Sequence, residues 1–260
     1  MKTGRPFLPL LALPALLLML SGCGGFSGVR PAKTVSGRAG DLLTRIDAIN
    51  SRLTACKGTG TITLRNAGNM PRMEFAWLCS PPDKIRLELL APTGQPLITL
   101  SSDGSHLYFL PHTRNGRVHK IKEKGMDLER ILSVPLPISD ASQLLAGRIP
   151  ILDFDTAERL DRPGGEYILR LNRQRPRAAE DIVFEGDSRR PVAIEFFQEG
   201  KKEPEYTVEL IGSQKIDNIP IPESIELINN HNGRRAMITI DRFWTSADVS
   251  ADKFILTDAP

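Results

Sequence analysis

The sequence predicts a mainly β fold of the α+β class, in which a curled antiparallel sheet carries one N-terminal helix and a short helical insertion. Roughly nine to eleven segments alternate apolar and polar residues with a period of two, which is typical of half-buried strands. An apolar stripe at helical spacing precedes them, and helix signals interrupt them at residues 127–147. So many antiparallel strands rarely stay flat, so we expect an open barrel with a helical lid.

The first element is an export signal. Lys2 and Arg5 precede the apolar stretch 7–20, which as a helix would span about 21 Å, too little for a bilayer core of about 30 Å. Residues 1–22 are therefore predicted to be a signal peptide. The segment Leu20-Ser21-Gly22-Cys23 resembles the bacterial lipobox. That resemblance implies cleavage before Cys23, a covalent diacylglycerol and N-acyl chain on Cys23, and no other cofactor. The alternative is an ordinary secretory signal with a chance cysteine.

The charge of the mature chain is close to zero. The whole chain carries 34 basic and 31 acidic residues, and removing Lys2 and Arg5 leaves 32 and 31, a net charge of +1. A dedicated nucleic-acid binder would be far more basic, so we expect no nucleic-acid partner. With 40% hydrophobic residues the chain can bury a core, which excludes wholesale disorder.

Gly24, rather than Asp, follows the cysteine. By similarity to enterobacterial sorting rules, this residue favours a location at the periplasmic face of the outer membrane.

A tether and a helix come next. Residues 23–40 are rich in Gly and Ser and are predicted to be a flexible tether. Residues 41–53 place Leu42, Ile46, Ile49 and Leu53 on one helical face. No linker divides the rest, so residues 41–260 are predicted to form a single domain.

The strands follow in two groups around a helical interruption. The first group covers 59–65, 73–79, 84–90, 96–101 and 106–110, and the second covers 166–172, 191–198, 206–211, 224–228 and 235–243. Between them, 127–132 and 141–146 are predicted to be short helices stopped by Pro135, Pro137 and Gly147. Residues 173–180 are interpreted as a polar loop, and 254–256 as a possible last strand.

Two cysteines test the register of the first hairpin. If strands 59–65 and 73–79 turn near Ala67–Gly68, Cys56 and Cys79 lie opposite each other. Cβ atoms of such a pair are about 4.5–5.5 Å apart, slightly more than the ~3.5–4.5 Å of a disulfide. A disulfide is favoured in the periplasm, and two buried free thiols are the alternative.

Catalytic patterns are weak. His106, His112, His119 and His231 show no zinc-ligand spacing, and the chain has no P-loop and no nucleophile elbow. The best acid–base pair is His106 with Asp103, so we expect no enzyme and no metal site. Large apolar side chains could instead line a concave face, although a filled core is the competing interpretation. The candidate cavity residues are Phe75, Trp77, Leu87, Leu89, Ile98, Leu100, Leu107, Phe109, Leu144 and Leu145.

An ordered set of segments resembles the LolB family of outer-membrane lipoprotein receptors, in the LolA-like carrier superfamily. The set comprises Phe75-Ala76-Trp77, Lys84–Leu89, Ala91–Gly94, Leu107–Phe109, Val134–Ile138, Gln143–Gly147, Ile221–Leu227, Ala236–Ile240 and Phe243-Trp244. The resemblance implies an unclosed eleven-stranded antiparallel barrel with a helical lid over a hydrophobic cavity. It also implies a monomer that receives lipoprotein acyl chains from a soluble periplasmic LolA-like carrier and helps insert them into the outer membrane, without a chemical step.

The loop Pro92-Thr93-Gly94 departs from that family. There the loop carries an exposed apolar residue, usually leucine, at the place of Thr93. Two alternatives to lipoprotein reception therefore stay open. One is a structural or assembly lipoprotein of an envelope complex with the same fold, and the other is a carrier of a different apolar ligand.

Overall fold

The computed structural model describes residues 33–65, 72–122, 127–186, 190–245 and 247–257. The chain divides into two compact units, residues 1–32 and residues 33–260, and only the second contains described residues. The predicted signal peptide, Cys23 and most of the predicted tether lie outside the described residues. Residues 33–40, however, belong to the folded unit, because β1 (Thr34–Val35) pairs with a strand and α1 (Gly37–Asn50) follows at once. The domain therefore begins earlier than the predicted residue 41.

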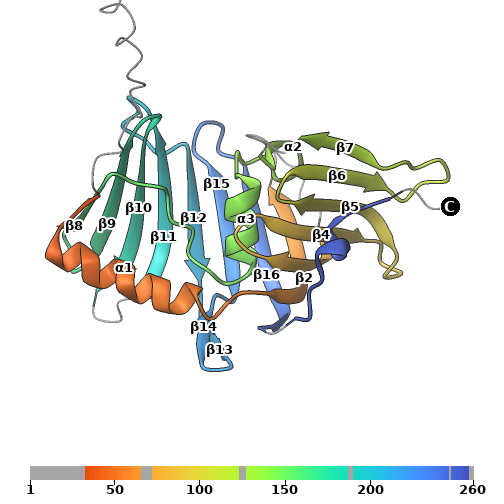
Figure 1. Ribbon diagram of the computed structural model, residues 1–260, viewed down its shortest axis with the longest axis horizontal. Coiled ribbons are helices and arrows are strands. Elements are labelled where there is room, and N and C mark those ends of the chain that lie inside the picture. The colour runs from red at the N-terminus through yellow and green to blue at the C-terminus, as the bar shows by residue number, and fades with distance from the viewer. Residues whose placement is uncertain (1–32, 66–71, 123–126, 187–189, 246, 258–260) are drawn as a thin grey trace, which may run out of the picture. The chain divides into compact units, whose positions relative to one another are not determined.

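One large sheet forms most of the domain (Figure 1). It has fourteen strands in the order β1-β8-β9-β10-β11-β12-β15-β16-β2-β3-β4-β5-β6-β7, and every pair except β1–β8 is antiparallel. Within the described ranges, the edge strands β1 and β7 do not pair with each other, so the predicted unclosed antiparallel fold is confirmed. The strand bounds are β2 (Cys56–Arg65), β3 (Arg72–Ser80), β4 (Lys84–Leu90), β5 (Pro96–Asp103), β6 (His106–Pro111), β7 (His119–Lys122), β8 (Thr156–Asp161), β9 (Tyr167–Gln174), β10 (Arg177–Glu185), β11 (Arg190–Gln198), β12 (Tyr206–Ile211), β15 (Ser224–Asn229) and β16 (Arg235–Trp244), while β13 (Gln214–Ile216) and β14 (Ile219–Ile221) form a separate small hairpin.

The sheet has more strands than the eleven that were expected. The largest omission is β10, part of which was interpreted as a polar loop. Its polar residues Glu180 and Asp181 are buried, so the alternation of polar and apolar residues that marks a strand is lost there. The expected strand at 254–256 is also wrong. The chain forms the 3₁₀ turn η2 (Ala251–Phe254) instead, and Phe254 and Leu256 anchor it as buried side chains.

Three α-helices of the described residues accompany the sheet. Helix α1 crosses strands β8 to β11 (Figure 1) and buries Ala39, Leu42 and Ile46. It starts after Ser36 rather than at Asp41, and it ends before Leu53, which is nevertheless buried. Helices α2 (Glu129–Leu132) and α3 (Ile138–Leu145) form the predicted helical insertion. We call residues 127–147 the lid.

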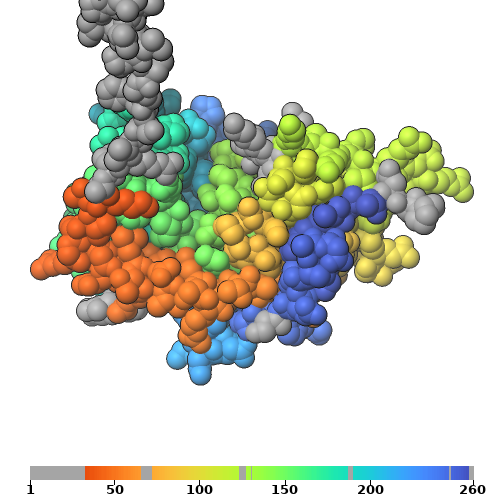
Figure 2. All heavy atoms as spheres, viewed as in Figure 1, coloured from red at the N-terminus to blue at the C-terminus, as the bar shows by residue number. Residues whose placement is uncertain are grey.

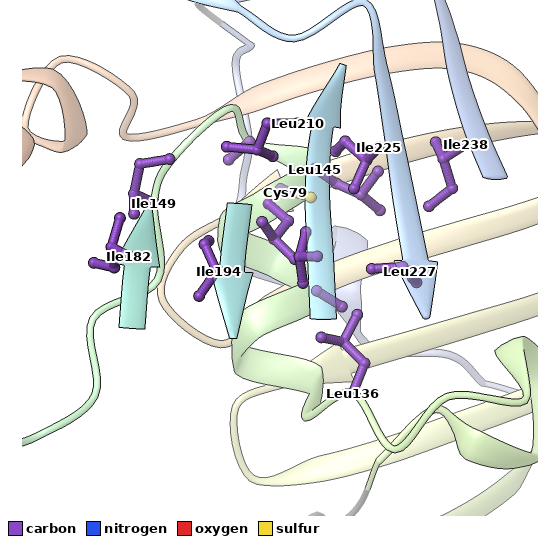
Figure 3. Close-up of a cluster of buried hydrophobic side chains, with 14 of the residues drawn as sticks. Cys79, Leu136, Leu145, Ile149, Ile182, Ile194, Leu210, Ile225, Leu227 and Ile238 are labelled. Carbon is purple, nitrogen blue, oxygen red and sulfur yellow. The ribbon is translucent and has the colours of Figure 1, made fainter. Parts of the chain in front are cut away.

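The core is continuous across the curled sheet. Side chains from α3, from the segment after it and from strands on both sides of it gather into one apolar cluster (Figure 3). Leu145 of the lid, Ile194 of β11 and Leu227 of β15 are all buried in this cluster. The C-terminal segment 247–257, dark blue in Figure 2, adds a separate cover over β4 and β5. There Ser101 Oγ donates a hydrogen bond to the Phe254 carbonyl at 2.8 Å.

Candidate functional site

An apolar cavity lies between the lid and the concave face of the sheet. All of its lining residues are aliphatic, alanine, methionine or phenylalanine. Its volume is about 80 Å³. The lining residues are Ile62, Leu64, Met73, Phe75, Leu87, Leu89, Ile98, Leu100, Phe109, Leu128, Ile131, Leu132, Leu136, Ala141, Leu144, Leu145, Ile225, Leu227 and Ile238.

The walls of the cavity follow from strand geometry. Every second residue of a strand points to the same face, so alternation places whole rows of side chains inward. The register aligns these rows between strands: Phe75 lies opposite Leu89, and Leu100 lies opposite both Leu87 and Phe109. The apolar face of β3 to β6 is therefore continuous, as the alternation predicts.

The lid forms the remaining wall. Helix α3 is buried on most of its surface, because strands lie on both sides of it. Leu144 and Leu145 are adjacent in sequence, and both are buried and line the cavity. Leu136 in the connection between α2 and α3 lines it as well.

Three side chains hold the C-terminal half of α3 against β2, β3 and β4. Trp77 donates its indole N–H to the carbonyl oxygen of Leu145 at 2.9 Å, and Cys56 Sγ approaches the same oxygen at 3.5 Å. Ser142 Oγ donates to the carbonyl of Lys84 at 2.9 Å. Since a buried hydrogen bond contributes about 1 kcal/mol, these contacts hold the lid closed only moderately.

The opposite side of the lid is held by polar groups from β12 and β15. Tyr206 donates its hydroxyl to Asp140 Oδ2 at 3.0 Å, and Asn229 Nδ2 donates to the carbonyl of Ser133 at 3.1 Å. A second carboxyl, Glu180 of β10, is buried near Asp140. Its Oε1 has no hydrogen-bond partner among the described residues.

Burial changes the acid–base properties of this cluster. Desolvation raises the pKa of Asp140, and hydrogen bonds from Tyr206 and Ser139 only partly offset this effect. Desolvation, followed by repulsion from Asp140, raises the pKa of Glu180 well above its ordinary value. The pKa of Tyr206 is raised well above normal by desolvation and by the same two carboxyls. The cluster therefore favours neutral carboxyl groups.

The structure places eight of the ten candidate cavity residues around the cavity: Phe75, Leu87, Leu89, Ile98, Leu100, Phe109, Leu144 and Leu145. Trp77 and Leu107 are buried but do not line it. Trp77 supports the lid instead, through its hydrogen bond to Leu145. Contact between any of these residues and a ligand stays a prediction.

Sequence reasoning missed part of the lining. Ile62, Ile225, Leu227 and Ile238 lie on strands that were predicted, and their alternation is visible in the sequence. Alternation predicts which side chains point inward, but it does not predict whether they line a cavity or pack in a filled core. These four residues were therefore not among the candidates. The lid residues Leu128, Ile131 and Leu132 belong to a helix too short to show a clear apolar stripe.

The two cysteines face each other as predicted, because Cys56 and Cys79 are register partners of β2 and β3. The structure shows them as buried free thiols, so the expected disulfide is not formed in it. The Cys56 thiol also donates to the Leu145 carbonyl oxygen. Desolvation raises the pKa of the Cys79 thiol well above its ordinary value, and the neighbouring Cys56 raises it further.

The loop Pro92-Thr93-Gly94 is exposed at the turn between β4 and β5. Gly94 has a positive φ of 80°, a conformation that favours glycine, and its N–H donates to the Ala91 carbonyl at 2.8 Å. Leu97 belongs to β5 and remains 48% exposed. Thr93 is therefore exposed but contributes little apolar surface.

The candidate acid–base pair has a structural role. Asp103 Oδ1 accepts the backbone N–H groups of Ser105 and His106, and its Oδ2 accepts the Tyr108 hydroxyl at 2.7 Å. Desolvation acts to raise the pKa of Asp103, but these hydrogen bonds outweigh it and lower the pKa. The carboxylate thus stabilises the turn between β5 and β6.

The part of the chain that the structure describes contains no group of three or more His, Cys, Asp or Glu residues able to hold a metal ion. No helix within the same ranges is long and apolar enough to cross a membrane.

Comparison with known proteins shows the fold. No protein-family model matches the chain, and no curated protein matches it significantly. Among solved structures, it is similar to a domain provisionally described as an outer membrane lipoprotein-sorting protein from Vibrio parahaemolyticus, with a TM-score of 0.61 and 11% identity over 82% of this chain and 94% of that one. A DUF1329 family protein from Desulfovibrio piger gives a TM-score of 0.60 and 12% identity, covering 84% and 96% of the two chains.

A third similar structure is a LolA superfamily protein from Nitrosomonas europaea, with a TM-score of 0.59 and 12% identity over 84% of this chain and 97% of that one. Three structures at such low identity agree over nearly their full length. The described domain therefore has the open-barrel fold of LolA-like proteins.

Proposed function

We propose that this chain, whose domain has the LolA-like fold, is a lipid-anchored envelope protein that binds the acyl chains of lipoproteins beneath its helical lid and helps deliver them to the outer membrane. The observation that carries this proposal is the wholly apolar cavity between the lid and the concave sheet. A site without polar groups selects ligands by apolar area, which suits hydrocarbon chains and does not suit catalysis.

The energetics favour such a ligand. Burying one methylene group contributes about 0.8 kcal/mol, so ten methylenes contribute about 8 kcal/mol. Opening the lid breaks the hydrogen bonds of Trp77, Ser142, Asn229 and Tyr206, at about 1 kcal/mol each. An acyl chain that enters as the lid moves can therefore offset the loss of these hydrogen bonds.

The size of the cavity requires that it opens. The cavity volume of about 80 Å³ is smaller than the roughly 150 Å³ of an engineered apolar cavity that holds one benzene molecule. A palmitoyl chain is much larger than benzene. We therefore propose that the lid or its side chains move outward when the ligand enters.

The anchor is proposed at Cys23, with the domain at the periplasmic face of the outer membrane. Cells grown with radiolabelled palmitate are expected to label the wild-type chain but not the Cys23→Ser variant. Labelling that survives this substitution would contradict the anchor without affecting the proposal for the cavity.

Binding is tested with a fluorescent C16 fatty-acid probe that a triacylated lipopeptide displaces. We expect saturable binding to the wild-type chain. In Leu89→Trp the larger side chain fills the cavity and binding is expected to fall at least tenfold, because losing about two methylene contacts costs about 1.6 kcal/mol. Leu97→Trp makes the same change at an exposed position outside the lining and is expected to bind normally.

The competing functions give different results. Displacement by other apolar compounds but not by the lipopeptide would indicate a carrier of a different apolar ligand. No probe binding at all, with a folded protein by circular dichroism, would reject the cavity as a binding site and leave the structural or assembly lipoprotein as the function to pursue.

A further inference from the structure

Five cationic side chains gather at the tips of two neighbouring hairpins. Arg173, Arg175 and Arg177 surround the β9–β10 turn, and Lys201 and Lys202 lie in the β11–β12 turn. Ala178 and Gln198 are register partners, which brings the two tips side by side. We call these five residues the basic corner. Four of them line a solvent-filled cleft of about 720 Å³, and Arg175 projects at the exposed tip of the same hairpin.

The positive charge of the basic corner is not neutralised within the domain. Among the described residues, none of the five forms an ion pair, and Arg173 Nε only donates to the Pro176 carbonyl at 3.0 Å. Arg170 at the base of the cleft is already bound to Asp181 through both carboxylate oxygens. Glu199 lines the same cleft, and Glu203 and Glu205 lie in the β11–β12 turn beside the two lysines, so three acids accompany the five cations. The basic corner therefore keeps an excess of positive charge.

The basic corner lies where the chain enters the domain. Thr34 N donates to the Asp155 carbonyl, Asp155 N donates to the Asn172 carbonyl, and Gln174 N donates to Asp155 Oδ2. These bonds place the first described residues beside the β9–β10 tip. From Cys23 to Lys33 the chain can extend at most about 35 Å. That reach is less than the breadth of a compact domain of this length, whose radius of gyration alone is about 17 Å. If Cys23 carries the anchor, this corner lies within that reach of the lipid surface.

We propose that the basic corner binds the anionic head groups of a phospholipid bilayer and orients the domain on it. Guanidinium and ammonium groups bind lipid phosphates, and exposed, unpaired cations are attracted to a negatively charged surface within a Debye length. The interaction does not involve the cavity and does not need the acyl anchor. The occupant is a membrane rather than a soluble anion, because a row of exposed cations on two tips matches an extended surface.

The experiment uses the chain without residues 1–23, which keeps the whole compact unit 33–260. Co-sedimentation is measured with vesicles of phosphatidylcholine alone and with vesicles that also contain phosphatidylglycerol. We expect binding only to the anionic vesicles, and we expect it to weaken as salt is added. The variant Arg173→Gln, Arg175→Gln, Arg177→Gln is expected to bind about a hundredfold more weakly, since each cation near such a surface contributes about fivefold.

A matched variant controls for net charge. Arg45→Gln, Arg52→Gln, Lys215→Gln removes the same charge from exposed residues away from the basic corner and is expected to bind within about twofold of wild type. Equal weakening in both triple variants would overturn the proposal, because it would make the effect one of net charge. Equal binding to neutral vesicles, or wild-type binding by the corner variant, would overturn it as well. None of these outcomes depends on whether the cavity binds acyl chains.

Discussion

Gly58 on β2 leaves the space that the indole of Trp77 occupies. A Cβ atom at position 58 would come within 2.1 Å of the Trp77 ring, and the two residues are register partners. The missing side chain thus lets the aromatic ring lie flat over the strand and reach the Leu145 carbonyl. One glycine on the sheet therefore determines how the lid is held.

Gly58→Ala is expected to displace Trp77 and destabilise the domain by about 1–3 kcal/mol, the usual cost of overpacking. Urea unfolding followed by circular dichroism gives the stability, and a shift in Trp77 emission reports the moved indole. Gly37→Ala is the control, because a Cβ there contacts nothing within 4 Å. Equal stability of Gly58→Ala and wild type would contradict the packing described here.

The carboxyl cluster at the base of the lid makes stability depend on pH. Glu180 has a raised pKa in the folded state, so the folded protein binds more protons than the unfolded chain above the ordinary pKa of 4.5. Stability is then fully present below that pH and is lost as pH rises toward the raised folded value. Asp140 acts in the same direction.

Glu180→Gln is expected to flatten this pH dependence, because the amide cannot ionise. The measurement is the urea midpoint at a series of pH values above 4.5. Glu74→Gln, at an exposed position on β3, serves as the control and is expected to follow wild type. An unchanged pH profile in Glu180→Gln would show that another group is responsible.

At the scale of elements, the lid is a short helix held by separate contacts on two sides. Ser142→Ala removes the bond to the Lys84 carbonyl, which costs about 1 kcal/mol and raises the open population about fivefold. We expect faster amide hydrogen exchange in residues 138–147 and faster uptake of the acyl probe. Ser51→Ala is the matched control, since that exposed hydroxyl donates to the Ala48 carbonyl and lies outside the lid. Slower uptake in Ser142→Ala would mean that the lid does not control entry.

Element prediction from the sequence succeeded where burial alternates. Strands β4 and β12 begin and end where the alternation of the sequence predicts, and in β12 buried residues alternate with less buried ones. Strand β7 was missed because all four of its residues are exposed at a sheet edge, and β10 because it buries charge. The early start of α1 comes from tertiary packing of Ala39, which overrides the poor helix propensity of its glycines.

From the sequence, the candidate site could be predicted only as an apolar face of the sheet and not as a cavity. The inward residues of β3 to β6 are readable from periodicity, whereas the gap between Leu89 and Leu144 depends on where the lid lies. Lid position in turn depends on single contacts such as Tyr206 with Asp140, which join residues far apart in sequence. No local pattern in the sequence predicts contacts between residues so far apart.

At the scale of the whole molecule, a single sheet links all the parts that form the cavity. Such a sheet is expected to unfold in one step, although chains of this length often show intermediates. Tryptophan fluorescence and far-UV circular dichroism should give the same urea midpoint, and Trp244→Phe leaves Trp77 as the only tryptophan. An earlier fluorescence transition would show that the lid region unfolds separately.

The pairing of β2 with β16 has a consequence for how the protein is made. These neighbouring strands lie near opposite ends of the domain sequence, so their pairing can form only when most of the chain is present. Contacts of this kind slow folding, and the unpaired edge of β2 is exposed to aggregation until its partner arrives. Ile62 of β2 and Ile238 of β16 both line the cavity. The apolar cavity is therefore incomplete until almost the entire polypeptide has been synthesised.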